Sequence, residues 1–208
     1  MRIYVVSDTV CPLCFVGKRR LESAMAQRPE MDFEVHWHPF QLNPDVPSEG
    51  VDRATYYAEK FGTGGRIEAM VEQLETIGSE LGINFDFSAI KTQPNTRLSH
   101  CFISAFEGET QSAVKEAVLS AFFEQGRDIG KREVLLEIAA ELGVDEALAT
   151  ASLADAALQA AVADRSEQAR ASGINGVPTF IFDQLHGFSG AQEEATFLQM
   201  FDQDHGRS

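Results

Sequence analysis

The chain has 208 residues, 44% of them hydrophobic, and a formal net charge of −15 at pH 7. This length can bury a core in one domain, or in one domain that carries a large insertion. The excess of acidic side chains speaks against nucleic acid and anionic membranes as partners, because both are bound through clusters of Lys and Arg. No apolar run approaches the roughly 20 residues that span a bilayer, and the first residues lack the pattern of a secretory signal. We therefore expect a cytoplasmic protein.

Two segments near the N-terminus predict β-strands. Residues 2–6 form a short apolar run, and residues 32–37 alternate between apolar and polar side chains. The segment between them, from about 12 to 27, predicts a helix. A β-α-β unit of this length forms a parallel strand pair with a right-handed crossover.

The middle of the chain is helical in pattern. From about residue 52 to 172 the sequence predicts six or seven helices, separated by glycine-containing breaks. In the stretch 111–125, Val114 and Val118 share an apolar face, whereas Lys115 is expected elsewhere on the helix.

The strand pattern returns near the C-terminus. Residues 177–182 favour a strand, residues 186–188 a second short one, and a helix follows from about 191 to 203. The order β-α-β, helical insert, β-β-α predicts an α/β chain with a thioredoxin-like fold and a large all-helical insertion domain. In this prediction the thioredoxin-like domain is discontinuous, with residues 1–48 and 173–208, and the insertion domain has residues 49–172.

The chain has three cysteines, too few for the disulfide framework of a small secreted protein. Cys11 and Cys14 lie where the first strand gives way to a helix, and the N–H groups and dipole of a helix N-terminus favour a thiolate. The first sulfur is expected to be the more exposed, so Cys11 is the predicted nucleophile and Cys14 the resolving thiol. Pro12 fits the first helical turn. Cys101 shares an apolar helical face with its neighbours and is expected to be buried.

Two cysteines at this spacing also form half of a zinc site, and an inert pair is a further alternative. No second Cys-x-x-Cys or Cys-x-x-His motif supplies the remaining ligands. The strand before the pair and the helix after it favour a redox dithiol, and we expect no metal.

Pro178 opens a predicted strand that should be central in the sheet, whereas prolines in sheets are largely confined to edges. A cis peptide at Val177–Pro178 would resolve this conflict by turning the chain beside the dithiol. Although only about 5–6% of X–Pro bonds are cis, the Cys-x-x-Cys upstream makes cis the prediction here.

Several short motifs run nearly from end to end of the chain: Ser7-Asp8, Cys11-Pro12-Leu13-Cys14, Gly17-Lys18, Pro39-Phe40-Gln41-Leu42-Asn43-Pro44, Asn95-Thr96 with His100, Gly173-Ile174-Asn175-Gly176-Val177-Pro178-Thr179-Phe180, and Gly190-Ala191-Gln192. Together they resemble the DsbA-like thioredoxin superfamily, and within it the FrnE-like branch. The resemblance implies a redox dithiol at Cys11 and Cys14, and a homodimer is one assembly that it suggests.

The resemblance also implies a substrate site around the dithiol. A cis-Pro178 loop would offer the backbone of Val177 to a bound peptide or to glutathione, next to Pro12 and Leu13. Further candidate contacts for glutathione or another substrate are Asn43, Asn95 and Thr96. In DsbA a histidine follows the Cys-x-x-Cys proline, whereas Leu13 offers the Cys11 thiolate neither charge nor a hydrogen bond. We therefore expect a less oxidising couple than that of DsbA.

Three functions remain open. The presence of both cysteines favours a DsbA-like thiol-disulfide oxidoreductase that acts on protein or small-molecule disulfides and thiols, with no tightly bound cofactor and with glutathione as a candidate co-substrate. The same branch includes kappa-type glutathione transferases and 2-hydroxychromene-2-carboxylate isomerases, which bind glutathione without relying on a dithiol. The second function is therefore a glutathione-dependent isomerase or transferase, and the third is a chaperone or partner-binding module with a vestigial dithiol.

Overall fold

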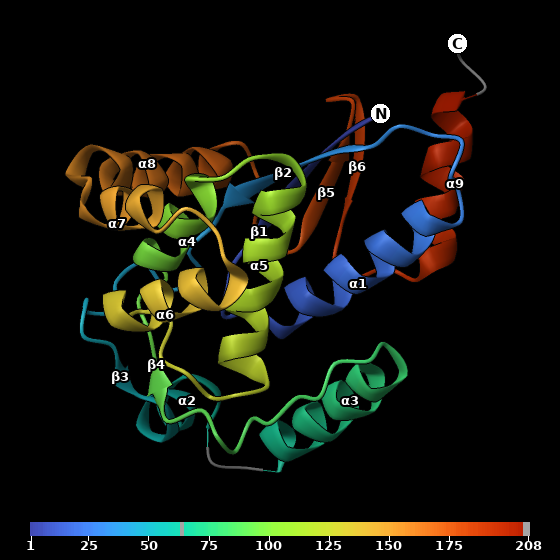
Figure 1. Ribbon diagram of the computed structural model, residues 1–208. Coiled ribbons are helices and arrows are strands. Elements are labelled where there is room, and N and C mark those ends of the chain that lie inside the picture. Colours follow the sequence, from blue (N-terminus) through green and yellow to red (C-terminus); the bar gives the residue numbers. More distant parts are fainter. Residues whose placement is uncertain (63–64, 206–208) are drawn as a thin grey trace.

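The structure is a computed structural model, and it describes residues 1–62 and 65–205. The elements in chain order (Figure 1) are β1 (Arg2–Ser7), α1 (Pro12–Ala26), β2 (Glu34–Pro39), β3 (Val51–Asp52), α2 (Arg53–Phe61), α3 (Arg66–Glu80), β4 (Thr92–Gln93), α4 (Arg97–Ser104), α5 (Gly108–Phe123), α6 (Arg132–Leu142), α7 (Glu146–Ala154), α8 (Ala156–Ala171), β5 (Thr179–Phe182), β6 (His186–Ser189) and α9 (Glu194–His205).

The main sheet has the strand order β2-β1-β5-β6. β1 pairs with β2 in parallel and with β5 antiparallel, so that Val5 lies opposite Trp37 on one side and Phe180 on the other. β1 is central in this sheet, which is why it reads as a continuous apolar run. α1 makes the crossover from β1 to β2 and packs beside α9 (Figure 1). This arrangement confirms the α/β, thioredoxin-like prediction.

Between residues 53 and 171 the described part of the chain forms seven helices, at the upper end of the predicted number. The prediction missed one element, a short antiparallel ladder in which Val51 pairs with Gln93 and Asp52 with Thr92. Strands of two residues carry no readable periodicity, so the sequence pattern cannot show them. The ladder ties the start of α2 to the segment before α4.

The hydrophobic core is continuous between the two predicted domains. One cluster of buried side chains includes Val5 and Phe15 from the thioredoxin-like part and Phe85 and Phe123 from the insertion. The rings of Phe15 and Phe85 lie 6.0 Å apart, edge to face, a geometry that stabilises beyond the burial itself. Because the core does not separate at residues 48 and 173, the domain boundaries stay a prediction.

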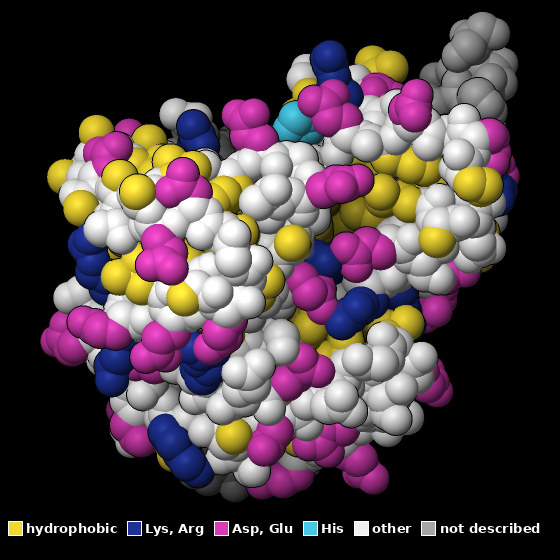
Figure 2. All heavy atoms as spheres, viewed as in Figure 1, with side chains coloured by type: hydrophobic (Ala, Val, Ile, Leu, Met, Phe, Trp, Pro, Cys, Tyr) yellow, Lys and Arg dark blue, Asp and Glu magenta, His cyan; other side chains and the backbone are white. Residues whose placement is uncertain are grey.

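Acidic side chains are spread over the face shown in Figure 2 rather than gathered in one patch. Within residues 1–62 and 65–205, no helix is both long and apolar enough to cross a bilayer. The charged groups on this face form no single patch that would mark a binding surface, so we look for the functional site among the cavities.

Candidate active site at the start of helix α1

The dithiol lies at the N-terminus of α1. Cys11 is the N-cap residue, with an extended backbone, and Pro12 occupies the first helical position. The backbone N–H of Cys14 donates to the carbonyl of Cys11 at 3.0 Å, which closes the first turn around the pair. Both thiols are free and buried, with exposed fractions of 6% for Cys11 and 1% for Cys14. The difference in exposure has the predicted sign but is small.

The loop before β5 faces this pair. The Val177–Pro178 peptide is cis, and the Cys11 thiol donates to the carbonyl oxygen of Val177 at 3.5 Å. Gly17 permits this close approach of α1, because a Cβ there would lie 3.0 Å from Pro178 and from the ring of Phe180. Residues from opposite ends of the chain thus meet at one sulfur atom.

The surroundings of Cys14 make its thiol less acidic than an ordinary cysteine thiol. Burial, a hydrogen bond with Cys11 and the charge of Cys11 raise the pKa of Cys14 well above its ordinary value, while the charge of Lys115 and a backbone hydrogen bond from Asp8 act in the opposite direction. Cys14 therefore stays protonated until a nearby charge or a reaction step draws its proton away.

Lys115, on α5, is a site residue that the sequence reasoning missed. Its exposed fraction is 1% and its ammonium group lies 5.6 Å from the ring centre of Trp37. Burial lowers the pKa of Lys115 to about 8, although the charges of Cys14, Asp8 and Cys11 attract its proton. The sequence predicts Lys115 outside the face of Val114 and Val118, but the structure buries it all the same, because α5 is buried on more than one side. A signal was present, since Val118, Leu119 and Phe122 follow Lys115 at helical spacings of three, four and seven.

A second buried charge, Asp8, organises the loop after β2. Asp8 accepts hydrogen bonds from His100 Nε2 at 3.1 Å and from the backbone N–H of Leu42 at 2.7 Å. Burial alone would raise the pKa of Asp8, but the hydrogen bonds from His100, Leu42 and Thr96 outweigh burial and leave it lowered. Burial is also the main cause that lowers the pKa of His100. An ionised Asp8 therefore accepts from a neutral His100, whose Nε2 carries the proton because its other neighbour is the carbonyl of Phe40.

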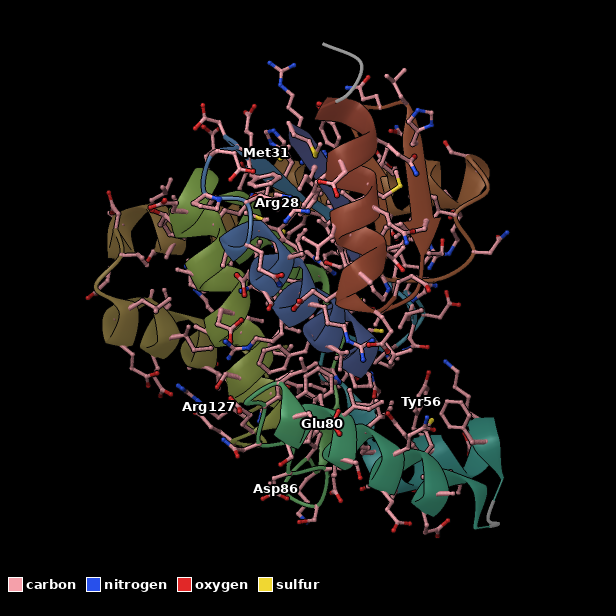
Figure 3. The ribbon with its side chains drawn as sticks, turned by 90° about the vertical axis from the view of Figure 1, so that its right-hand side faces the viewer. Arg28, Met31, Tyr56, Glu80, Asp86 and Arg127 are labelled. Atoms are coloured by element: carbon pink, nitrogen blue, oxygen red, sulfur yellow. The ribbon has the colours of Figure 1, made fainter. Side chains whose placement is uncertain are left out.

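A cavity of about 400 Å³, the dithiol pocket, opens beside Cys11. Its walls come from the start of α1, the loop after β2, helices α2 and α3, and β4. Figure 3 shows α2, with Tyr56, and α3, with Glu80, in the same layer of the molecule. The lining residues are Val10, Cys11, Pro12, Leu13, Leu42, Asn43, Tyr56, Tyr57, Lys60, Phe61, Met70, Gln73, Leu74, Ile77 and Gln93.

The structure divides the remaining predicted substrate contacts into two groups. Leu13 and Asn43 line the dithiol pocket, whereas Asn95 and Thr96 do not. The side chain of Asn95 accepts from Gln41 at 3.1 Å and donates to the carbonyl of Val46 at 2.6 Å, and Thr96 is buried beside Asp8. Asn95 and Thr96 therefore support the loop that carries Asn43 rather than face the pocket.

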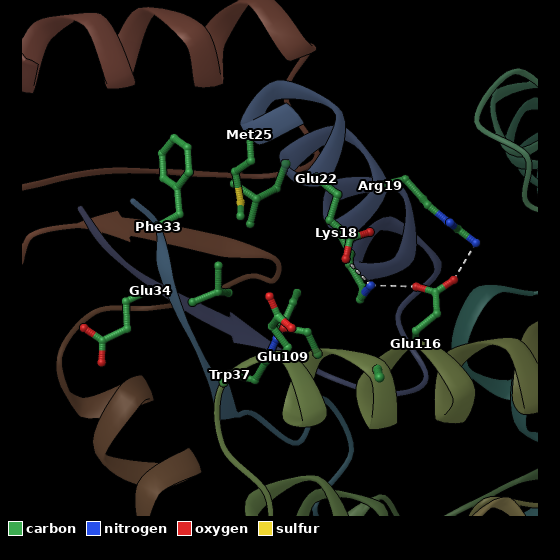
Figure 4. Close-up of a pocket in the computed structure, with 14 residues that line it drawn as sticks. Lys18, Arg19, Glu22, Met25, Phe33, Glu34, Trp37, Glu109 and Glu116 are labelled. Carbon is green, nitrogen blue, oxygen red and sulfur yellow. Dashed lines mark hydrogen bonds and ion pairs between the residues drawn. The ribbon is translucent and has the colours of Figure 1, made fainter. Parts of the chain in front are cut away.

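A larger cavity, of about 550 Å³, lies between α1, β2 and α5 and contains neither thiol (Figure 4). The buried ammonium group of Lys18 is paired there with Glu22 at 2.5 Å and with Glu116 at 2.8 Å, and Arg19 also pairs with Glu116. Since these charges pair with one another and this cavity contains neither thiol, the dithiol pocket is the candidate active site. Cys101 lies in neither cavity, and burial raises its pKa to about 11.

The fold and the dithiol agree with a comparison against protein families. A family model described as a DSBA-like thioredoxin domain matches residues 2–202. The chain belongs to this family. Family membership alone does not distinguish the FrnE-like branch, which stays a prediction.

Two relatives and one further structure of the same fold are similar to this chain. The chain is 33% identical over 187 residues to the uncharacterized protein YwbO of Bacillus subtilis, covering 87% of this chain and 86% of that protein. It is 30% identical to a probable DsbA oxidoreductase, SCO1869, from Streptomyces coelicolor, with a TM-score of 0.88 over 100% of this chain and 91% of that one. The cytosolic disulfide reductase DsbM from Pseudomonas aeruginosa, solved with GSH, shares the fold at 20% identity, with a TM-score of 0.65 and 98% of both chains covered.

Proposed function

We propose that this DsbA-like protein is a thiol-disulfide oxidoreductase that works through Cys11 and Cys14. The observation that carries the proposal is the arrangement of two free thiols in the first turn of α1, with Cys11 in contact with the carbonyl of Val177. A vestigial or structural pair has no need of a cavity beside its first sulfur, whereas a dithiol that exchanges with a substrate does.

In the first step, the Cys11 thiolate attacks one sulfur of a substrate disulfide. A new bond joins Cys11 to that sulfur, the substrate S–S bond breaks, and the other sulfur leaves as a thiolate. The unsatisfied N–H groups at the start of α1 stabilise the negative charge on Cys11 before the attack. The cis Val177–Pro178 loop and the side chains of Pro12 and Leu13 border the path of the incoming disulfide.

In the second step, Cys14 loses its proton and attacks the sulfur of Cys11. The internal disulfide closes and the second substrate thiolate leaves, so that the protein gives up two electrons in all. The raised pKa of Cys14 opposes this step, and the charge of Lys115 reduces the opposition. Lys115 is thus a positioning charge for the resolving thiol.

The cycle needs a thiol that restores the dithiol. Glutathione is our proposal for this co-substrate, and protein or small-molecule disulfides are the proposed substrates. A cytosolic disulfide reductase with the same fold has been solved with GSH, which supports a reducing role in the cytoplasm, where thiols are kept reduced.

Equilibration with graded glutathione redox buffers tests the proposal. After acid quench and alkylation, mass analysis of peptides reports the state of each cysteine. We expect one reversible two-electron transition confined to Cys11 and Cys14, lost in Cys14→Ser, while Cys101 stays reduced. If only a glutathione adduct forms on Cys11, and no internal disulfide, a glutathione-dependent isomerase or transferase replaces the oxidoreductase.

A further inference from the structure

The dithiol pocket gathers much of the exposed apolar surface of the chain. Among the described residues, seven large hydrophobic side chains are exposed, and four of them, Leu13, Leu42, Phe61 and Met70, line this pocket. Exposed apolar groups that converge on one cavity mark a binding site for an apolar ligand. The four side chains come from α1, the loop after β2, α2 and α3, so the fold brings them together.

The pocket also differs from the rest of the protein in charge. The chain has 32 acidic and 17 basic side chains, yet no described residue that lines the pocket is acidic, and Lys60 is the one Lys or Arg among them. A ligand with a negative charge thus meets no repulsion from the pocket walls and finds one cation.

Hydrogen bonds hold the ammonium group of Lys60 at the wall of the pocket. Its ammonium group donates to Asn43 Oδ1 at 2.5 Å and to the hydroxyl of Tyr56 at 2.9 Å, and Tyr56 also donates to Asn43 Oδ1. An ammonium group has three donors, so one N–H remains for a ligand. The contacts on Asn43 and Tyr56 fix the position of the charge at the wall of the pocket.

The size of the pocket sets the class of ligand. A volume of about 400 Å³ lies within the range of roughly 300 to 1,000 Å³ that is usual for small-molecule sites. A stable contact with a folded protein would instead cover about 800 Å² of each partner. The pocket therefore fits a whole small molecule, with room for one or two rings.

We infer that the dithiol pocket selects low-molecular-weight disulfides that have an apolar, aromatic body and a carboxylate, with Lys60 holding the carboxylate. The inference rests on the proposed function and names its substrate class. Cys11 attacks the disulfide RSSR to give Cys11–S–S–R and RS⁻. Cys14 then releases the second RS⁻ as the internal disulfide forms, so one RSSR is reduced to two thiols and the dithiol is oxidised.

A single-turnover comparison of four disulfides tests this substrate class. Pre-reduced protein is mixed with 5,5′-dithiobis(2-nitrobenzoate), which is aromatic and anionic, 4,4′-dithiodipyridine, which is aromatic and neutral, glutathione disulfide, and hydroxyethyl disulfide. Each rate is corrected with Cys11→Ser and divided by the rate of a free small thiol, which removes the intrinsic reactivity of the disulfide. We expect the highest ratio for the anionic aromatic compound, at least about tenfold above that for glutathione disulfide.

Variants of Lys60 separate the charge from the apolar walls. Lys60→Met is expected to lower the ratio for the nitrobenzoate compound about three- to tenfold while changing that for dithiodipyridine less than twofold, and Lys60→Arg should retain the preference. Lys91→Met, which removes an equal charge outside this pocket, serves as the matched control. Met70→Ser should lower both aromatic ratios by a larger factor than that of glutathione disulfide. Equal circular dichroism spectra and melting temperatures verify that each variant is folded.

The outcomes distinguish this inference from the proposed function. If all four ratios are similar, or if Lys60→Met and Lys91→Met have the same effect, the substrate class is wrong although the internal disulfide still forms. If no disulfide oxidises Cys11 and Cys14 to the internal bond, both the oxidoreductase and its substrate class are refuted.

Discussion

Replacement of Lys115 by Met takes a charged group out of the protein interior and leaves a side chain of similar length. Burial lowers the pKa of Lys115 from 10.5 to about 8. The difference between these two values, at about 1.36 kcal/mol per pH unit, corresponds to about 3 kcal/mol. Between about pH 8 and 10.5 the unfolded chain binds more protons at this lysine than the folded chain does, so the free energy of unfolding of the wild type should rise by about that amount. Lys115→Met should lack this rise.

The measurement is urea unfolding of the reduced protein at a series of pH values from 7 to 10.5, followed by circular dichroism. Across this range, the unfolding free energy of the wild type should rise by about 3 kcal/mol relative to that of Lys115→Met. Lys131→Met is the control, because the side chain of Lys131 is 62% exposed, and its difference from the wild type should stay constant. If Lys115→Met gains stability with pH as steeply as the wild type does, the assignment of a buried, titrating lysine beside the dithiol is wrong.

Three further predictions concern the loops and the thiols. The pKa of Asp8 is lowered in the folded protein, so the ionised carboxylate stabilises the fold fully above its unfolded pKa of about 3.9. This stabilisation is lost as pH falls through the folded pKa. Asp8→Asn should therefore flatten the acid limb of a plot of melting temperature against pH. Asn95→Ala should cost about 1–3 kcal/mol in urea unfolding, because it leaves polar partners in the loop unsatisfied, while the single-turnover rate with glutathione disulfide stays within about twofold; a large loss of rate at unchanged stability would instead make Asn95 a substrate contact. The reduction potential should lie well below the roughly −120 mV of DsbA and rise in Leu13→His, as measured in glutathione buffers; a wild-type value near −120 mV would contradict the role given to Leu13.

Sequence reasoning succeeded where the signal is local. The order of strands and helices follows from periodicity, and the position of Cys11 and Cys14 at the start of α1 follows from the apolar run that precedes them. The environment of these thiols could not be found in this way. The charge of Lys115 acts on Cys14 only because α5 packs against β2, and the sequence assigns a lysine to the surface by default.

The dithiol pocket shows the same limit. Asn43 was a candidate contact by resemblance, but its partners Tyr56 and Lys60 lie on α2, whose position depends on the β3–β4 ladder that periodicity cannot show. The same resemblance makes Asn95 a candidate contact, yet the Asn95 side chain hydrogen-bonds to Gln41 and to the carbonyl of Val46 in the loop. Such assignments depend on which way a polar side chain points, and that is decided by tertiary packing.

The contact between Cys11 and Val177 joins residues that are 166 positions apart. A ribosome that adds about 5 to 20 residues per second needs roughly 8 to 33 s to cover that distance. For this interval a nascent chain presents its two thiols without the loop that will cover the first of them. The dithiol is thus among the earliest parts of the protein to be made, and its surroundings are among the last to be completed.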